Sequence, residues 1–138
     1  MRNFFEDIYP DIFLAVVALM YIFLNWKSDL AHILGASLAI ISFILWIIAR
    51  INLGRSFSVR TEAKELTTSG LYSKIRNPIY IFSALFLLGI LIALEKIYLY
   101  LLLLILIIIQ VRRARKEEKI LKTTFGQKYT EYRSHAWF

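Results

Sequence analysis

Two apolar runs separated by one charged pair decide the fold of this chain. Residues 79–110 read IYIFSALFLLGILIALEKIYLYLLLLILIIIQ, in which Glu95 and Lys96 are the only charged residues. A helix that crosses the bilayer core needs about 20 mainly apolar residues, with roughly 17–25 tolerated. Because a short connection joins antiparallel helices, the segments before Ile79 and after Gln110 are predicted to return to one membrane face.

The composition places the whole chain among integral membrane proteins. It has 138 residues, of which 59% are hydrophobic, and a mean hydropathy of +0.60. Such a hydrophobic share is above that of soluble domains. The predicted fold class is therefore all-α, with about four transmembrane helices followed by a C-terminal cytoplasmic helix; the apolar stretches are about 9–26, 30–50, 79–94 and 97–110. The first stretch lacks a small-residue cleavage site, so we expect it to be retained as a span.

The net charge of +7 is concentrated in two segments. Basic residues crowd the loop between the second and third spans and the region after the fourth, whereas the other two turns carry only Lys27 and Lys96. By the positive-inside rule, the long loop and both termini are predicted to face the cytoplasm. Topology and anionic lipid explain this charge, so we predict membrane lipids as partners and no nucleic acid.

The long polar loop is the first candidate for function. Residues 52–75 are too long and too polar to be only a connector, and long loops on rigid scaffolds often carry function. Pro78 keeps Asn77 out of the α region and fits a first helical turn, so the third span is predicted to start at Asn77 or Pro78. The N–H groups and the positive end of the helix dipole would then point into the polar region.

The segment after the fourth span is expected to stay helical to about Thr124 and to end at Gly126, because glycine favours helix C-termini. The aromatic tail that follows is expected to pack on the membrane surface; it comprises Tyr129, Tyr132, Trp137 and Phe138.

Within this helix, Arg113 and Glu117 are spaced i, i+4 and so share a face. The plain interpretation is a solvated ion pair, although arginine before glutamate is the less favourable order. In the functional interpretation, Arg113 holds an anionic substrate group by bidentate hydrogen bonds. Glu117 would then face a cationic or hydroxyl-bearing cofactor. Arg76 allows the same two interpretations, as a membrane anchor or as a site residue beside a helix N-terminus.

These segments together resemble a known family. Four blocks of sequence, in order around the hairpin, are similar to the isoprenylcysteine carboxyl methyltransferase family and its relatives, the phospholipid N-methyltransferases; the blocks are Gly70-Leu71-Tyr72, Arg76-Asn77-Pro78-Ile79-Tyr80, Arg113 to Glu117-Glu118, and Phe125-Gly126 to Tyr129 and Tyr132. The resemblance runs from about Lys64 to Tyr132. It implies a membrane enzyme that binds S-adenosylmethionine at the cytoplasmic face.

The resemblance also implies which residues bind the cofactor and the substrate. Arg113 matches the residue that contacts the substrate carboxylate. The family usually has histidine where this chain has Lys64 and Asn77, and asparagine can still donate and accept hydrogen bonds. Carried over by position, the cofactor contacts fall on Lys64, Glu65, Leu66, Thr67, Tyr72, Asn77, Pro78, Ile79, Tyr80 and Glu117.

The chemistry of methyl transfer fits this inventory. S-adenosylmethionine carries a reactive sulfonium, so the protein needs mainly to align the acceptor and exclude water. A carboxylate acceptor needs no general base, whereas an amine must lose a proton, for which Glu118 is the nearby candidate. The predicted catalytic residues are Arg76, Arg113 and Glu118. The chain has no cysteine, and His32 and His135 are far apart, so we predict no metal site and treat both histidines as structural or surface residues.

The expected organisation is one structural domain with two parts. Residues 1–51 form an N-terminal transmembrane helix pair, and residues 52–138 hold the cofactor-binding loop, the transmembrane hairpin and the C-terminal cytoplasmic segment. The acceptor is expected to be a lipidic or prenylated molecule that reaches the site sideways from the bilayer. The sequence leaves its identity and the oligomeric state open.

Two other functions remain open at this point. A membrane sterol-reductase-like enzyme would keep the fold and bind NADPH, but the tail typical of that class contains a cysteine that this chain lacks. A small four-span transporter or scaffold matches the length, but ion-coupled transporters usually place an ionisable residue inside the membrane. Here the first, third and fourth spans have none near their middles, and the candidate in the second span, His32, lies close to one end.

Overall fold

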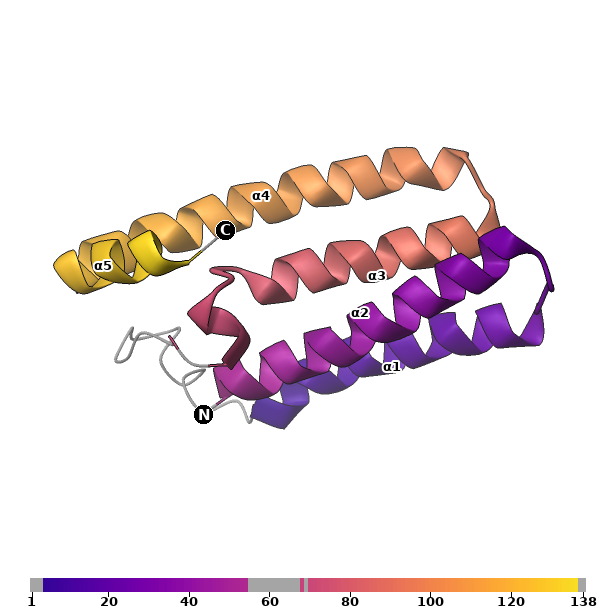
Figure 1. The fold of residues 1–138 in the computed structure, drawn as a ribbon, viewed down its shortest axis with the longest axis horizontal. Helices are drawn as coiled ribbons and strands as arrows, with labels where there is room; N and C mark the ends of the chain where they lie inside the picture. The colour runs from indigo at the N-terminus through magenta and orange to yellow at the C-terminus, as the bar shows by residue number, and fades with distance from the viewer. Residues whose placement is uncertain (1–3, 55–67, 69, 137–138) are drawn as a thin grey trace.

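The computed structural model describes residues 4–54, 68 and 70–136, and every regular element among them is helical. Four long helices run side by side with alternating direction, and α5 folds back beside the end of α4 (Figure 1). The all-α prediction is confirmed for these residues, whereas Lys64, Glu65, Leu66 and Thr67 lie outside them. The elements are α1 (Phe4–Leu24), α2 (Leu30–Gly54), the short 3-10 helix η2 (Gly70–Ser73), α3 (Pro78–Leu94), α4 (Tyr98–Phe125) and α5 (Gln127–His135).

The turn between α3 and α4 is as tight as predicted. Glu95 caps α3 in the left-handed region, with φ of 53°, and its N–H donates to the Leu91 carbonyl at 3.0 Å. A single left-handed residue is a common way to end a helix. Since α4 begins at Tyr98, the chain reverses within a few residues and the two helices form an antiparallel hairpin.

Helices α2 and α3 form the most extensively packed pair of the bundle, and small residues let their backbones approach. A Cβ atom added at Gly35 would lie 2.4 Å from the Ala93 backbone nitrogen, and one added at Gly89 would lie 2.5 Å from that of Ala39. Close backbone approach over small residues is a usual way for membrane helices to associate. The pair therefore forms the rigid centre on which α1 and α4 pack.

Helix α1 starts earlier than the apolar pattern predicted and continues through Pro10. Asp11, which interrupts the first apolar stretch, forms an ion pair with Arg50 of α2, in which Oδ2 lies 2.8 Å from Nη2. The Arg50 guanidinium also lies 5.1 Å from the centre of the Trp46 ring, within the range of a cation–π contact. The charge of Asp11 thus joins α1 to α2.

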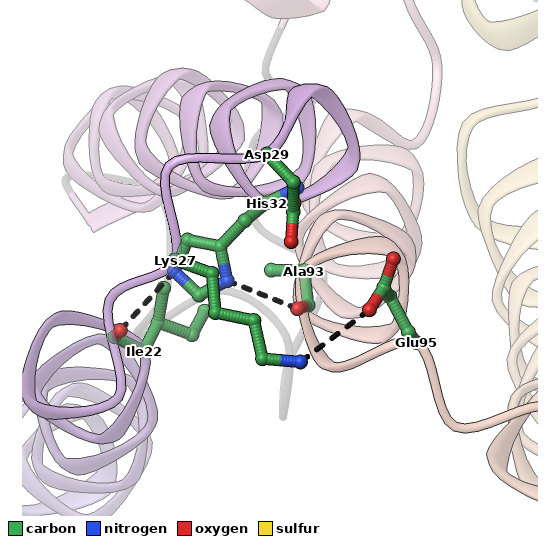
Figure 2. A network of polar contacts seen from close by, with 6 residues as sticks. All are labelled: Ile22, Lys27, Asp29, His32, Ala93 and Glu95. Atoms are coloured by element: carbon green, nitrogen blue, oxygen red, sulfur yellow. Dashed lines mark hydrogen bonds and ion pairs between the residues drawn. The ribbon is translucent and has the colours of Figure 1, made fainter.

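Buried His32 ties three helices together at the end of the bundle that carries the two short turns (Figure 2). Its ring nitrogens Nδ1 and Nε2 lie 3.1 Å from the Ala93 carbonyl oxygen and 3.2 Å from that of Ile22, in the last turns of α3 and α1. Its backbone N–H donates to the Asp29 side chain at 2.7 Å, which caps α2. Carbonyls in a last helical turn lack partners within the helix, and an N–H of the ring donates to one of these two. The prediction of a structural role is confirmed.

The outer faces of the bundle are apolar. Exposed large hydrophobic side chains cover α1, α2 and the first half of α4, as contact with lipid requires. Among the described helices, α2 is long and apolar enough to cross a membrane over Leu30–Leu53, and the apolar segments Tyr9–Leu24 and Pro78–Leu94 are shorter. Helix α4 joins an apolar half to a charged half that follows Gln110. Among the described helices, α2 is therefore the candidate span, and the other three predicted spans remain predictions.

Candidate active site

The candidate site lies at the end of the bundle where α3 begins, and local sequence explains how it starts. Asn77 is the N-cap residue of α3 and Pro78 occupies the first turn, as predicted. The Asn77 side chain is half-buried and makes no capping hydrogen bond, whereas Pro78 and Ile79 are buried. Pro78 and Ile79, both in the predicted set, therefore hold the start of α3 in the core, whereas the Asn77 amide is not used as a helix cap.

A hydrogen bond joins the start of α3 to the middle of α4. The Tyr80 hydroxyl donates to Glu117 Oε1 at 2.5 Å, across 37 positions of sequence. One turn further along α3, Gln110 Nε2 donates to Ser83 Oγ at 2.9 Å, and Ser83 Oγ donates to the Tyr80 carbonyl at 3.0 Å. The two helices are therefore connected by polar bonds at two successive levels.

A third set of polar contacts is made by the carboxylate of Glu118, which pairs with two arginines. Glu118 Oε1 lies 2.8 Å from Arg76 Nη1 and 3.2 Å from Arg133 Nη1. The Arg76 and Glu118 side chains are both about three-quarters buried, at 24% and 25% exposed, so this pair is better shielded than a surface ion pair. We call Arg76, Tyr80, Glu117, Glu118, Tyr72 and Tyr132 the polar cluster.

Helix α5 closes the polar cluster from the far side. Gly126 ends α4, with φ of 53° and ψ of −117°, a conformation that favours glycine, and α5 runs back from it. The Tyr132 hydroxyl donates to the Tyr72 carbonyl of η2 at 2.5 Å, and Tyr129 is 2% exposed. Tyr129 and Tyr132 were expected at the membrane surface. They lie inside the protein instead, because the turn at Gly126 directs the chain inward.

Burial shifts the acidity of both tyrosines. It raises the pKa of Tyr132 to about 12, with the neighbouring Tyr129 adding to the rise and Arg76 opposing it. Burial also raises the pKa of Tyr129, helped by the Glu118 carboxylate and opposed mainly by Arg76. Both phenols therefore keep their protons at neutral pH and remain able to donate hydrogen bonds.

The structure brings together part of the predicted site. Arg76 pairs with Glu118 and Tyr80 with Glu117, although these residues come from separate sequence blocks. Tyr72 joins the polar cluster through its backbone carbonyl, while its side chain packs in the apolar core. Arg113 is exposed, one helical turn before Glu117, and makes no hydrogen bond or ion pair within the described part of the chain. Lys64 to Thr67 cannot be compared, since they lie outside the described residues.

Sequence reasoning missed three contributors to the site. Ser83 and Gln110 lie in apolar runs, where a polar side chain often marks a helix–helix hydrogen bond, and that signal was present in the sequence. Arg133 was counted only as part of a basic tail, and its pairing with Glu118 depends on the reversal at Gly126. Within the described ranges, no group of three histidine, aspartate or glutamate side chains could hold a metal ion.

Polar side chains gather at one end of an apolar helix bundle, an arrangement that suits a membrane enzyme. The model of the phospholipid methyltransferase family matches residues 30–128, and the chain belongs to this family. It is therefore a membrane protein and an S-adenosylmethionine-dependent methyltransferase, and the family implies a lipid as the methyl acceptor. No curated protein and no solved structure matches the chain.

The matched range contains the polar cluster apart from Tyr132, and the family favours the methyltransferase among the three functions that the sequence left open. The residues present also suit the cofactor. A half-buried carboxylate beside a phenol hydroxyl, as in Glu117 and Tyr80, offers an anion for cationic groups and acceptors for ribose hydroxyls.

Proposed function

We propose that this protein methylates a lipidic or prenylated acceptor bearing a carboxylate, in the manner of the isoprenylcysteine carboxyl methyltransferases within the wider family. The observation that carries the proposal is the hydrogen bond between Tyr80 and Glu117. It connects the two sequence blocks that resemble the cofactor site. S-adenosylmethionine, when bound, supplies an electrophilic methyl group on a sulfonium.

Glu117 and Tyr80 are proposed to be the centre of the cofactor site. Tyr80 orients the Glu117 carboxylate through its hydrogen bond to Oε1, and a carboxylate can accept hydrogen bonds or pair with a cation. Asn77 and Tyr72 would border the same site, and Pro78 and Ile79 would shape it through backbone position. Lys64, Glu65, Leu66 and Thr67 complete the proposed cofactor set by resemblance alone.

Arg113 is proposed to bind the anionic group of the acceptor. It is exposed on α4 beside Glu117 and has no partner within the described residues, so its guanidinium is free to form a bidentate pair with a carboxylate. Arg76 would add positive charge near the start of α3. A charged pair of this kind orients the acceptor oxygen toward the transferred methyl group, which is the main requirement of the reaction.

Glu118 is proposed to hold Arg76 in place. Its Oε1 lies within ion-pair distance of both Arg76 and Arg133, so two guanidinium groups already engage this carboxylate. A carboxylate acceptor is nucleophilic without a base. This arrangement therefore supports O-methylation above N-methylation.

The same proposal includes the topology and the division of labour. Four spans, with both termini and the polar cluster at the cytoplasmic face, are supported by the charge distribution and the apolar outer faces. Residues 1–51 would shape the membrane route of the acceptor, and residues 52–138 would bind the cofactor. The acceptor would then arrive sideways from the bilayer.

N-methylation of an amine-bearing phospholipid is the second candidate, favoured by membership of the phospholipid methyltransferase family. One experiment separates the two. Purified protein is incubated with a membrane lipid extract and S-adenosylmethionine labelled in the methyl group, and the labelled lipid is then treated with mild alkali. A methyl ester releases the label as methanol, whereas an N-methyl group retains it.

Release of the label as methanol supports a carboxylate acceptor. Retention of the label on the lipid shows that the acceptor is an amine instead. If no lipid is labelled and calorimetry detects no binding of S-adenosylmethionine in detergent or bilayer, the proposed function is wrong. The Glu117→Ala variant is the matched control for labelling that does not depend on the site.

A further inference from the structure

Helix η2 is held from two sides at one residue, Tyr72. The Tyr72 side chain is 6% exposed and belongs to the apolar core with Trp46, Ala49 and Phe82. Its backbone carbonyl is the acceptor for the Tyr132 hydroxyl. Local hydrogen bonds shape the segment as well: the Lys74 and Ile75 N–H groups donate to the Leu71 carbonyl, and Ser73 Oγ donates to the Gly70 carbonyl.

We propose that Tyr132 is a positioning residue for cofactor binding, which acts by fixing the Tyr72 carbonyl and thereby the η2 segment that borders the site. The proposal rests on the proposed function of the same site, and it assigns a role to α5 that the family resemblance does not supply. Tyr132 reaches the predicted cofactor residue Tyr72 through its backbone carbonyl.

The chemistry of the bond permits only one direction. A carbonyl oxygen accepts and cannot donate, so the phenol must be the donor. The phenol keeps its proton at neutral pH, as its raised pKa requires. Replacement by phenylalanine removes this one oxygen and leaves the ring, so the variant tests the hydrogen bond and little else.

Helix α5 is itself anchored, so the Tyr132 hydroxyl is presented at a fixed place. Tyr129 is buried one turn earlier, its ring lies 6.2 Å from that of Tyr132, and Arg133 reaches Glu118 at 3.2 Å. Through Glu118 the same helix is connected to Arg76, just before α3. Thus α5 links η2, α3 and α4 around the proposed cofactor residues, and Tyr132 makes its hydrogen bond to η2.

The test compares wild type with Tyr132→Phe, with Tyr98→Phe as the matched control because Tyr98 is an exposed phenol at the opposite end of α4. A net hydrogen bond corresponds to about a two- to tenfold change in an equilibrium constant. We expect Tyr132→Phe to raise the dissociation constant of S-adenosylmethionine by about that factor, whereas the acceptor KM and kcat at saturating cofactor stay within about twofold of wild type.

Hydrogen exchange provides a readout independent of turnover. The amides of Lys74 and Ile75 should exchange faster in Tyr132→Phe than in wild type and should recover protection when S-adenosylmethionine saturates the protein. Tyr98→Phe should match wild type in both measurements. Should Tyr132→Phe fail to yield folded protein, Tyr132→Trp, which keeps the aromatic bulk and removes the phenol, takes its place.

The inference is overturned if the variant binds S-adenosylmethionine as wild type does, or if kcat falls while cofactor affinity is unchanged. A lowered melting temperature with unchanged affinity would likewise reduce Tyr132 to a purely structural residue. If wild type itself binds no S-adenosylmethionine, the proposed function fails, and the exchange of the Lys74 and Ile75 amides still decides whether Tyr132 orders η2.

Discussion

The hydroxyl of Tyr80 lies 2.5 Å from Glu117 Oε1, so the third and fourth helices meet through a phenol–carboxylate bond near the polar end of the bundle. The tight reversal at Glu95 makes this contact possible, because it returns α4 along α3. Residues at the two ends of the hairpin sequence thereby become neighbours. Any chemistry at this end must use groups from both helices.

The first prediction concerns the cofactor. Replacing Glu117 with glutamine keeps the shape of the side chain and removes its charge, so we expect the dissociation constant of S-adenosylmethionine to rise about tenfold or more, since hydrogen bonds to charged groups are worth about 1.5–3 kcal/mol. Isothermal calorimetry in detergent measures the change. Glu131→Gln, an exposed position on α5, is the control and should bind as wild type does. Equal affinities in the two variants would remove Glu117 from the cofactor site.

The second prediction separates the acceptor from the cofactor. Arg113→Ala removes an exposed guanidinium that has no partner within the described residues, so it should leave the fold and cofactor affinity unchanged. We expect the acceptor KM to rise by at least tenfold, because a charge-assisted pair with the acceptor would be lost. The neighbouring Arg115→Ala is the control for loss of one positive charge near the membrane. If both variants weaken the acceptor equally, general attraction to anionic lipid explains the effect.

The third prediction tests the end of the bundle opposite the site. His32→Ala leaves a cavity and strands the carbonyls of Ile22 and Ala93, so the free energy of unfolding should fall by about 2–4 kcal/mol. Thermal unfolding in detergent reports this loss. His135→Ala changes an exposed histidine on α5 and should leave the melting temperature within about one degree of wild type. A wild-type melting temperature for His32→Ala would show that the ring does not join α1 to α3.

Local chemistry was sufficient to predict much of the fold and part of the site. The hairpin, the start of α3 at Asn77 and Pro78, and the end of α4 at Gly126 follow from residues that act within a few positions of themselves. The contact of Tyr80 with Glu117 then follows from the hairpin. The start of α1 at Phe4 was missed, because Pro10 and Asp11 interrupt the apolar pattern. The helix nevertheless continues through both residues, and Asp11 pairs with Arg50 of α2.

Contacts that depend on the register between distant helices could not be predicted. Whether Gly35 faces Ala93, or Ser83 faces Gln110, is set by the crossing of whole helices and leaves only a weak trace in the sequence. The bond from Tyr132 to Tyr72 spans 60 positions and also needs the inward turn at Gly126. The same turn explains why Tyr129 and Tyr132 were expected at the membrane surface and instead lie inside the protein beside η2 and α4, whereas Trp137 and Phe138 lie outside the described residues.

The last prediction concerns the effect of alkaline pH on stability. The pKa of Tyr132 is about 12 in the folded protein, above its ordinary value of 10.0, chiefly because the phenol is buried. Between these two values the unfolded chain has lost the proton while the folded protein keeps it, so ionisation favours unfolding and stability falls as pH rises. The contribution of Tyr132 is thus fully present below about pH 10 and is lost as pH approaches about 12.

The melting temperatures of wild type and Tyr132→Phe, measured in detergent from pH 8 to pH 12, isolate this contribution. Groups other than Tyr132 titrate in both proteins and largely cancel in the difference, whereas Tyr98→Phe controls for the removal of any phenol. We expect wild type to be the more stable below pH 10 and the difference to shrink steadily toward pH 12. A difference that stays constant across the range would mean that Tyr132 ionises alike in the folded and unfolded chain, and a difference of zero below pH 10 would mean that its bond to Tyr72 contributes nothing to the fold.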